Sequence, residues 1–585
     1  MGGFLLHHRG AGMKREKWFV AAKKADFEAI GKRFGIDPVI ARVIRNRDIE
    51  GEEAIRTYLY GTLDDLYDPA LMKGIPEAVP ILLEKVKSKV KIRVIGDYDI
   101  DGVMSTYILW EGFRRLGANV DTVIPHRIQD GYGLNDELIR AAYEDGVDTI
   151  VTCDNGIAAY DQIVYADSLG MTVIVTDHHE IPFEEGDGVR TYRIPPAAVV
   201  IDPKQQDCGY PFSGICGAVV AMKLMQALFE AAGLGSENAL AAFLEMAAFA
   251  TVGDVMELVD ENRILVKYGL RAMMHSGNAG LRALIEVCEM GGRQLGAYHI
   301  GFILGPCLNA TGRLDTAKRA LALLQCETRK EALPVAMDLK HLNESRKEMT
   351  QQGVERAQRL IEEQGLAQRK VLILYLPDCH ESLAGIIAGR IRERYEKPVF
   401  VLTDSEEGIK GSGRSIESYS MYEEMSRCKD LFIKYGGHKM AAGLSLPKEN
   451  VAAFMERMEA GCTLTEEDCT AKVHIDVPMP FSYVNQKLIE QFSLLEPFGN
   501  GNRKPLFAQK NVTLLGSRVL GKSGRVGKYT VLDENGGRFE LTYFGDQEEL
   551  LIYWQQKRKV SVAYYPELNT FRGRTEIQFI LQNVQ

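Results

Sequence analysis

The sequence contains no apolar run long enough to span a membrane, and it shows no secretory signal. The opening residues, Met1 to Leu6, lack the Ser or Thr at the sixth position that a myristoylation signal needs. The ten cysteines include no Cys-x-x-Cys pair. Together these absences argue against a membrane-bound or disulfide-stabilised protein and predict a reduced, soluble, cytoplasmic one.

The chain also lacks an excess of positive charge, since its formal net charge is −10. Such a balance normally argues against nucleic acid as a partner. The charge is uneven, however: residues 500–585 hold 13 Lys and Arg against 8 Asp and Glu, which makes this tail +5 and the remainder −15. A local basic face is therefore compatible with the sequence. The length of 585 residues predicts two to four domains.

The most informative stretch is residues 91–104, where a short apolar run ends on three alternating aspartates. The run predicts a buried strand, so Asp97, Asp99 and Asp101 should project from its carboxyl end, where open α/β sheets bind their ligands. Crowded carboxylates repel one another unless they are protonated or neutralised by a cation. This pattern predicts a metal site, and the alternative for this stretch alone is a solvated acidic turn.

Strands and amphipathic segments alternate after this stretch, which predicts βαβ units and a parallel sheet. The apolar runs are 92–96, 120–124, 147–153, 172–176 and 198–201, and the amphipathic segments include 134–144 and 158–169. The third run ends near Asp154, and the fourth ends at His178 and His179. Because parallel strands bring their carboxyl ends to one edge, Asp154 and His178 should meet Asp99 and Asp101 there. An isolated His-His pair is more often a turn, but three such strand ends in succession favour a site.

Further along, residues 237–252 predict a buried helix that delivers Asp254, or else a simple helix-ending turn. Residues 305–314 show no clear periodicity, and their Arg313 could face either solvent or an anion. A long polar helix at 336–364 suits a bridge between domains. At the other end of the chain, residues 14–75 look helical. Met13–Trp18 also has a helical sequence, so translation could start at Met13 instead of Met1. The first dozen residues should then be disordered.

A second, smaller α/β unit begins with a strand at 371–376, followed by glycine-rich stretches at 380–390, 410–415 and 436–443. Two of them contain arginine, which together with accessible backbone N–H groups predicts an anion site. The last segment, about 465–585, contains five short β-like runs with interleaved aromatics. It predicts either an OB-type barrel that tracks single strands by stacking and charge, or a structural barrel with its aromatics in the core.

Seven motifs occur in an order that resembles the RecJ-type single-strand-specific exonucleases of the DHH phosphoesterase family. The resemblance covers about residue 75 to the end of the chain. The motifs are Gly96–Gly102, Asp154–Gly156, Asp177–His179, Asp254, Leu308–Arg313, Gly411–Ser415 and Gly436–His438, and residues 495–507 resemble the start of the barrel in bacterial members.

The resemblance implies an α/β fold in several parts. These are an N-terminal extension and helical segment (1–75), a parallel-sheet DHH catalytic domain (76–335), a connecting helix (336–365), a smaller DHH-associated α/β domain (366–462) and an OB-type barrel that binds nucleic acid (463–585).

It also implies a two-metal site, with Mn²⁺ preferred and Mg²⁺ as the substitute. The implied ligands are Asp99, Asp101, Asp154, His178 and Asp254, with Asp154 as the bridge, while Asp97 either completes the coordination of one ion or acts from behind it. His179 is assigned to the scissile phosphate or the leaving group. Arg313 and His438 are expected to be catalytic residues that contact the DNA backbone. Arg127, Ser412 and Arg414 are expected to hold the terminal 5′-phosphate.

The function implied is metal-dependent 5′-to-3′ hydrolysis of single-stranded DNA to 5′-mononucleotides in DNA repair and recombination. The expected partners are single-stranded DNA, a helicase and a single-strand-binding protein, and the chain is expected to be a monomer without membrane contact. Two alternatives remain: a family phosphodiesterase acting on short oligonucleotides or cyclic dinucleotides, and a non-catalytic DNA-binding scaffold.

Overall fold

The computed structural model describes residues 16–127, 133–186, 189–405, 408–521, 524–571 and 573–585. The chain forms two compact units, which are described separately. The first unit comprises residues 52–346 and 495–504, and the second unit comprises residues up to 51, 347–494 and 505–585. The predicted disorder of the first dozen residues lies outside the described ranges.

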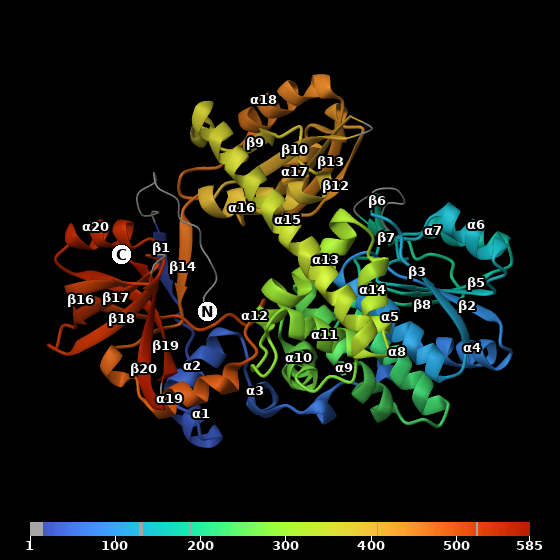
Figure 1. Ribbon diagram of the computed structural model, residues 1–585, viewed down its shortest axis with the longest axis horizontal. Helices are drawn as coiled ribbons and strands as arrows, with labels where there is room; N and C mark the ends of the chain where they lie inside the picture. The colour runs from blue at the N-terminus through green and yellow to red at the C-terminus, as the bar shows by residue number, and fades with distance from the viewer. Residues whose placement is uncertain (1–15, 128–132, 187–188, 406–407, 522–523, 572) are drawn as a thin grey trace. The chain divides into compact units, whose positions relative to one another are not determined.

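A five-stranded parallel sheet organises the first unit, in the order β3-β2-β4-β5-β8 (Figure 1). Its strands are β2 (Lys91–Ile95), β3 (Asn119–Val123), β4 (Thr149–Cys153), β5 (Thr172–Thr176) and β8 (Val199–Ile201), each within two residues of the predicted run. The chain leaves β2 toward β3 on one side and returns to β4 on the other. The strand order therefore reverses between β2 and β4, which is where doubly wound sheets bind ligands.

Helices cover both faces of this sheet, as the alternation of side chains along buried strands requires. Ile92 and Val94 face a core that includes α5 (Ile100–Arg115) and α8 (Gly217–Ala231), whereas Ile95 faces α6 (Asp136–Glu144) and α7 (Tyr160–Ser168). The predicted buried helix is α9 (Ser236–Gly253), and Asp254 caps its end. The other helices of this unit are α3 (Glu52–Tyr60), α4 (Ile75–Lys87), α10 (Asp260–Met273), α11 (Ala279–Val287), α12 (Ala297–His299) and α14 (Lys318–Gln325).

Three features of the chain between residues 183 and 363 differ from the sequence prediction. Residues without clear periodicity form helix α13 (Gly305–Leu314), which follows a π-helical turn at Ile300–Leu304, and a hairpin of β6 (Phe183–Gly186) and β7 (Val189–Tyr192) was not predicted. The long polar helix α15 (Arg329–Glu363) starts before residue 336. It does so because Thr328 and Glu331 exchange side-chain hydrogen bonds with each other's backbone N–H groups, which forms a capping box.

A second sheet, with strand order β12-β13-β11-β10-β9, belongs to the second unit. Its strands are β9 (Leu372–Tyr375), β10 (Val399–Ser405), β11 (Gly408–Arg414), β12 (Lys434–Gly437) and β13 (Ala441–Leu446), and its helices are α16 (Ala384–Tyr395), α17 (Met421–Ser426) and α18 (Val451–Gly461). The predicted helical start of the chain is wrong at Glu16–Val20. These residues form strand β1, which pairs in parallel with β14 (Ala471–Ile475), and this distant partner overrides the local helical pattern.

The C-terminal strands of the second unit close into a barrel because β16 pairs with both β17 and β19. They are β15 (Val477–Pro478), β16 (Phe507–Leu520), β17 (Val526–Leu532), β18 (Arg538–Phe544), β19 (Val560–Phe571) and β20 (Arg574–Val584), with α19 (Gln486–Gln491) and α20 (Gln547–Gln555) beside them. Many aromatics lie inside: Phe481, Phe507, Tyr529 and Tyr564 are buried. These four aromatics lie in the core, as expected of a structural barrel, whereas the side chain of Phe544 is 45% exposed.

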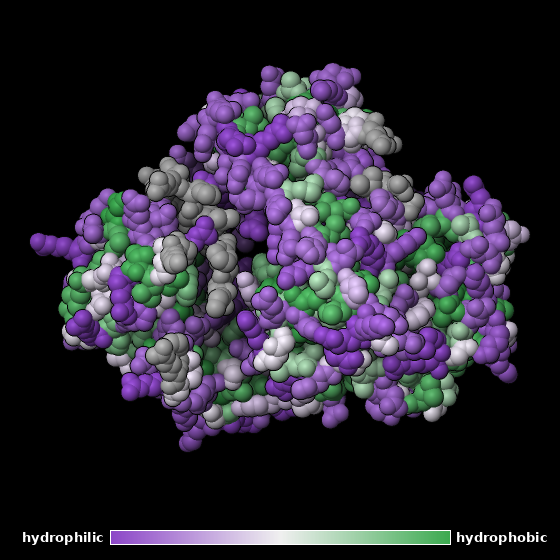
Figure 2. Space-filling model, in the orientation of Figure 1, coloured by the Kyte–Doolittle hydropathy of each residue, from purple (hydrophilic) through white to green (hydrophobic). Residues whose placement is uncertain are grey.

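The second unit also contains α1 (Phe27–Phe34) and α2 (Pro38–Asn46), and α2 begins at Pro38 because the Asp37 side chain caps it. On the face shown in Figure 2, hydrophilic residues predominate and hydrophobic ones are scattered among them. Within the described ranges, no helix is both long and apolar enough to traverse a lipid bilayer.

Candidate metal centre

The three aspartates after β2 lie on a tight turn into α5. Asp97 and Asp101 are buried, and the Asp99 side chain caps the helix by accepting a hydrogen bond from Gly102 N at 3.1 Å. A Cβ at residue 102 would lie 2.4 Å from the Asp97 carbonyl oxygen, so the turn requires glycine there. The turn thereby points a carboxylate-rich loop at the reversal point of the sheet.

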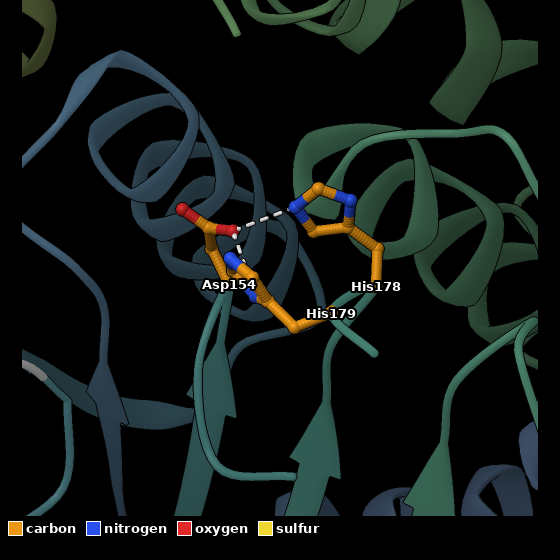
Figure 3. Close-up of side chains that lie close together, drawn as sticks. All are labelled: Asp154, His178 and His179. Carbon is orange, nitrogen blue, oxygen red and sulfur yellow. Dashed lines mark hydrogen bonds and ion pairs between the residues drawn. The ribbon is translucent and has the colours of Figure 1, made fainter. Parts of the chain in front are cut away.

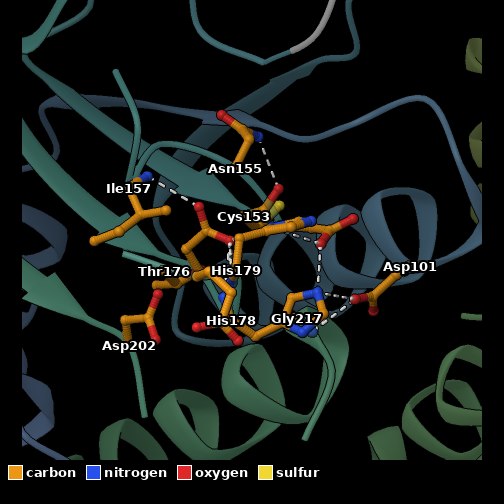
Figure 4. Close-up of polar contacts among 12 residues, drawn as sticks. Asp101, Cys153, Asn155, Ile157, Thr176, His178, His179, Asp202 and Gly217 are labelled. Atoms are coloured by element: carbon orange, nitrogen blue, oxygen red, sulfur yellow. Dashed lines mark hydrogen bonds and ion pairs between the residues drawn. The ribbon is translucent and has the colours of Figure 1, made fainter. Parts of the chain in front are cut away.

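Asp101 is held by the start of helix α8. Its two carboxylate oxygens accept hydrogen bonds from Gly217 N at 2.6 Å and Ala218 N at 2.8 Å (Figure 4). A Cβ on residue 217 would come within 2.9 Å of Asp154 Cβ and 3.1 Å of Asp101 Oδ2. The sequence analysis missed Gly217, because nothing local shows that two carboxylates approach its backbone.

Asp154 and His178 come from the ends of the neighbouring strands β4 and β5. Asp154 has a φ of 59°, a left-handed conformation that aspartate tolerates better than most residues. Its Oδ1 lies 3.0 Å from His178 Nε2, and both imidazole rings of the His178–His179 pair lie near its carboxylate (Figure 3). The next residue, Asn155, donates to the carbonyl oxygens of Ile95 and Cys153 and so ties the ends of β2 and β4 together.

Asp254 reaches the same place from the end of α9. Its Oδ2 lies 3.9 Å from His178 Nε2, and Asp101 Oδ2 lies 3.4 Å from the same nitrogen. The structure therefore brings together all six side chains predicted as metal ligands. Three overlapping sets have ligand atoms within 4.8 Å of one another: Asp97, Asp99 and Asp154; Asp101, His178 and Asp254; and Asp154, His178 and His179.

The electrostatics of this cluster suit a cation. Burial, followed by the neighbouring carboxylates, raises the pKa of Asp97 and of Asp254 to about 8 and raises the pKa values of Asp99 and Asp154 above their usual range. Burial lowers the pKa of His178, which keeps its imidazole neutral and able to bind a metal. Asp97 Oδ1 and His178 Nδ1 are buried without a hydrogen-bond partner among the described residues. Buried carboxylates and one neutral imidazole fit hard divalent cations such as Mn²⁺ and Mg²⁺.

His179 is oriented by Asp177, a residue that the sequence analysis quoted in a motif but gave no role. His179 Nδ1 lies 2.7 Å from Asp177 Oδ1, and Asp177 also accepts from Ile157 N, His178 N and His179 N (Figure 4). Burial disfavours the charged imidazole, but the hydrogen bond to Asp177 and nearby carboxylates raise the pKa of His179 to about 9. His179 is 46% exposed, so it presents a protonated ring toward solvent beside the cluster.

Two arginines of the predicted set lie near the same turn. The Arg127 guanidinium stacks on the ring of Tyr98, with 4.8 Å to the ring centroid, and Tyr98 stands between Asp97 and Asp99. Helix α13 approaches the turn from another side: a Cβ on Gly312 would lie 2.4 Å from the Tyr98 carbonyl oxygen. Arg313, the next residue, contributes with Arg127 to the electrostatic field at Tyr98. Arg313 therefore lies close enough to the aspartate turn to act on it electrostatically, and its contact with the DNA backbone stays a prediction.

The remaining predicted residues belong to the second unit. Arg414 Nη1 donates to Ser412 Oγ at 3.2 Å, and a Cβ on Gly385 in the first turn of α16 would lie 2.6 Å from Arg414 Nη2 and 2.8 Å from Ser412 Oγ. A guanidinium, a hydroxyl and a helix N-terminus thus meet around a glycine, which suits a phosphate. His438 is exposed after β12. Binding of the 5′-phosphate by Ser412 and Arg414, and contact of His438 with the DNA backbone, stay predictions.

The raised carboxyl pKa values predict how stability depends on pH. Because Asp97 and Asp254 hold protons up to about pH 8 when folded and only to about pH 4 when unfolded, the metal-free protein should lose stability as the pH rises between these values. Mn²⁺ replaces these protons, so it should raise the melting temperature more at pH 8 than at pH 6. Calorimetric melting curves with and without Mn²⁺ check this, and an Mn²⁺ effect independent of pH would contradict it.

Comparisons with known proteins agree with this arrangement. A model of the DHH family N-terminal domain matches residues 91–251, a model of the DHHA1 domain matches residues 368–463, and a model of the RecJ OB domain matches residues 475–583. The single-stranded-DNA-specific exonuclease RecJ of Escherichia coli (strain K12) is 33% identical over 570 residues, which cover 94% of this chain and 96% of that protein. The RecJ of Bacillus subtilis (strain 168) is 32% identical over 574 residues, covering 97% of this chain and 70% of that protein.

Among solved structures, the crystal structure of RecJ in complex with Mn²⁺ from Thermus thermophilus matches with a TM-score of 0.81 and 28% sequence identity, over 98% of this chain and 80% of that chain. The parallel sheet with carboxylates at its reversal point and the DHH and DHHA1 matches define a protein of the DHH class. Within that class, the near full-length identity and the matched OB domain show that the chain belongs to the RecJ family.

Proposed function

We propose that this chain is a metal-dependent exonuclease that hydrolyses single-stranded DNA from the 5′ end and releases 5′-mononucleotides. The observation that carries the proposal is the convergence of five aspartates and one histidine, from four separate stretches of sequence, on one edge of the sheet. Membership of the RecJ family supports the substrate and the reaction. The barrel matched by the RecJ OB domain supports a polymeric substrate over a dinucleotide.

Asp97, Asp99, Asp101, Asp154, His178 and Asp254 would hold two divalent cations. Asp154 and His178 each belong to two of the overlapping sets, and Asp154 is the expected bridge because a carboxylate can bind one ion with each of its two oxygens. When bound, such ions activate water and neutralise the charge of the phosphodiester, and Mn²⁺ is preferred with Mg²⁺ as the substitute. The protein itself supplies a proton: His179, held by Asp177, can donate to the leaving oxygen. Arg313 and His438 would contact the DNA backbone and help to orient the scissile phosphate.

The test compares substrates under the same conditions. Labelled single-stranded DNA, duplex DNA, cyclic dinucleotides and short oligonucleotides are incubated with the chain and Mn²⁺, and products are resolved by length. Rapid stepwise shortening of the single strand from its 5′ end, with slow turnover of the other substrates, is expected. Preferred hydrolysis of dinucleotides would favour a small-substrate phosphodiesterase, and binding without cleavage would favour a scaffold.

The 5′ direction would depend on Arg127, Ser412 and Arg414, the residues assigned to the terminal 5′-phosphate. A charge-assisted hydrogen bond contributes roughly 1.5–3 kcal/mol, so 5′-phosphorylated DNA should be cut on the order of 10–100 times more efficiently than 5′-hydroxyl DNA. Arg414→Ala should lower kcat/KM only for the phosphorylated strand and remove this preference. The exposed Arg427, which pairs with Glu424 in the same unit, provides the matched Arg427→Ala control. A preference that survives in Arg414→Ala would contradict the assignment.

The family resemblance also supports three further proposals, which concern the compartment and oligomeric state, the partners and the domain limits. The chain would act as a cytoplasmic monomer in repair and recombination. A helicase would supply the single strand, and a single-strand-binding protein would keep it accessible. We also propose that these tasks are divided along the domain limits predicted from the sequence, with a connecting helix between two α/β domains and a terminal barrel.

A further inference from the structure

Residues 495–504 are contributed by the C-terminal part of the chain, between α19 and barrel strand β16, yet they cluster with the first unit. They contact the loop 255–258, which begins directly after Asp254 and leads into α10. A segment at the start of the barrel therefore meets the backbone beside a predicted metal ligand.

The contacts bind the loop at both of its ends. Asn500 Nδ2 donates to the Val255 carbonyl oxygen at 2.8 Å, and Leu258 N donates to the Asn500 carbonyl oxygen at 2.8 Å. Gly501 has a φ of +70°, and a Cβ there would lie 2.9 Å from Glu257 Cβ. The segment thus lies flat against the loop, and its glycine permits the close approach.

The segment is itself firmly anchored. Asn502 is fully buried: its Nδ2 donates to the carbonyl oxygens of Leu495 at 2.8 Å and Pro497 at 2.7 Å, and its Oδ1 accepts from Tyr58 Oη at 2.9 Å. Arg263, at 2% exposure, donates to Leu495 O and Tyr58 O, each at 3.0 Å, and lies over the Tyr58 ring. Burying this many polar groups is costly unless each is satisfied, so the arrangement has one well-defined geometry.

The carboxylate of Asp254 is positioned differently from those of Asp99 and Asp101. Two backbone N–H groups donate hydrogen bonds to the Asp101 carboxylate, and the Asp99 side chain caps a helix. Asp254, in contrast, lies at the end of a helix, directly before Val255, whose φ is 59°. The direction of its carboxylate depends on the backbone that follows. Groups that support a metal ligand without touching the ion commonly change metal affinity by about 10–100-fold.

We propose that residues 495–504 are a positioning element for the metal site, and that Asn500 acts through Val255 and Asp254 on the affinity for one of the two cations. The inference deepens the proposed function, because it takes the carboxylate cluster to be the metal centre. It assigns a role in metal binding to a segment that lies outside the sheet and its helices.

The test uses the full chain and Mn²⁺ alone. Asn500→Ala removes the donor to Val255 but leaves the backbone contact to Leu258. Asn500→Asp keeps the shape and also removes the donor. Asn238→Ala is the matched control, because the exposed Asn238 likewise donates to one carbonyl oxygen, that of Leu234, at the opposite end of α9 from Asp254. Mn²⁺ affinities are measured by the electron paramagnetic resonance signal of free Mn²⁺, and metal-free melting temperatures are measured in parallel.

Both Asn500 variants should weaken one Mn²⁺ equilibrium by about 10-fold while leaving the other unchanged, with the metal-free melting temperature of the control. DNA cleavage should recover at high Mn²⁺. Unchanged Mn²⁺ affinity in both variants would overturn the proposal. A metal-free Asn500→Ala protein that unfolds would also overturn it, since the role would then be structural. If the unmutated chain binds Mn²⁺ but cuts no DNA, the proposed function fails while the affinity comparison still decides this inference.

Discussion

Asp154→Asn should abolish hydrolysis of single-stranded DNA, with a loss on the order of 10³-fold or more in kcat. Carboxylate oxygens of Asp154 lie within 4.8 Å of carboxylate oxygens of Asp97 and Asp99, and also within 4.8 Å of ring nitrogens of His178 and His179. Asparagine has the same shape but carries no charge, so it cannot balance two cations or bridge them. Cleavage of labelled single-stranded DNA in saturating Mn²⁺ measures the effect, and DNA binding in the absence of metal should persist.

The same substitution should stabilise the metal-free protein, which separates a functional ligand from a structural residue. Burial and the carboxylates around Asp154 raise its pKa well above the usual range, so ionisation of this carboxyl opposes folding. Removing the charge relieves that cost, and the melting temperature without metal should rise. Asp167→Asn, at an exposed position on α7, is the control and should change neither property. Cleavage by Asp154→Asn at a rate near that of the unmutated chain would refute the bridging assignment.

His179→Gln should lower kcat by about 10²–10⁴-fold while Mn²⁺ stoichiometry stays at the unmutated value. The reason is that the two adjacent histidines have different roles. His178 Nε2 lies 3.0 Å from Asp154 Oδ1. His179 is hydrogen-bonded through Nδ1 to Asp177, and its side chain remains 46% exposed. One imidazole is neutral and available to a metal, and the other is protonated and available to substrate. His275→Gln, at an exposed histidine that follows α10, serves as the control.

Asp177→Asn tests the source of that proton. A group that acts as an acid loses activity as the pH rises through its pKa, so the alkaline limb of kcat/KM reports His179. Against the effect of burial, the hydrogen bond to Asp177 and the neighbouring carboxylates raise the pKa of His179 to about 9 in the metal-free site. Bound cations would shift it downward in the variant and the unmutated chain alike. Replacing Asp177 should move the limb to lower pH. An alkaline limb at the same pH in both proteins would exclude His179 as the acid.

The elements around the site could be predicted from sequence because their signals are local. A buried parallel strand appears as an apolar run, and its carboxyl end is marked by the polar residues that follow, so the order of the runs assigns Asp99, Asp101, Asp154 and His178 to one edge. The position of Asp254 could be predicted because it directly follows a helix that is apolar on nearly every side and must therefore be buried. The same kind of local pattern misled at Glu16–Val20, where a helical sequence pairs with Ala471–Ile475 as a strand.

What the sequence alone determined, then, is which residue types stand at the strand ends and the order of the elements that carry them. Only the tertiary structure decided how those residues are held: Asp101 by the backbone of Gly217 and Ala218, and His179 by Asp177. It also decided that residues 495–504 lie against the loop after Asp254. The physical reason is that periodicity and propensity act between near neighbours, whereas these contacts join residues far apart along the chain, or depend on side-chain directions that exist only after packing.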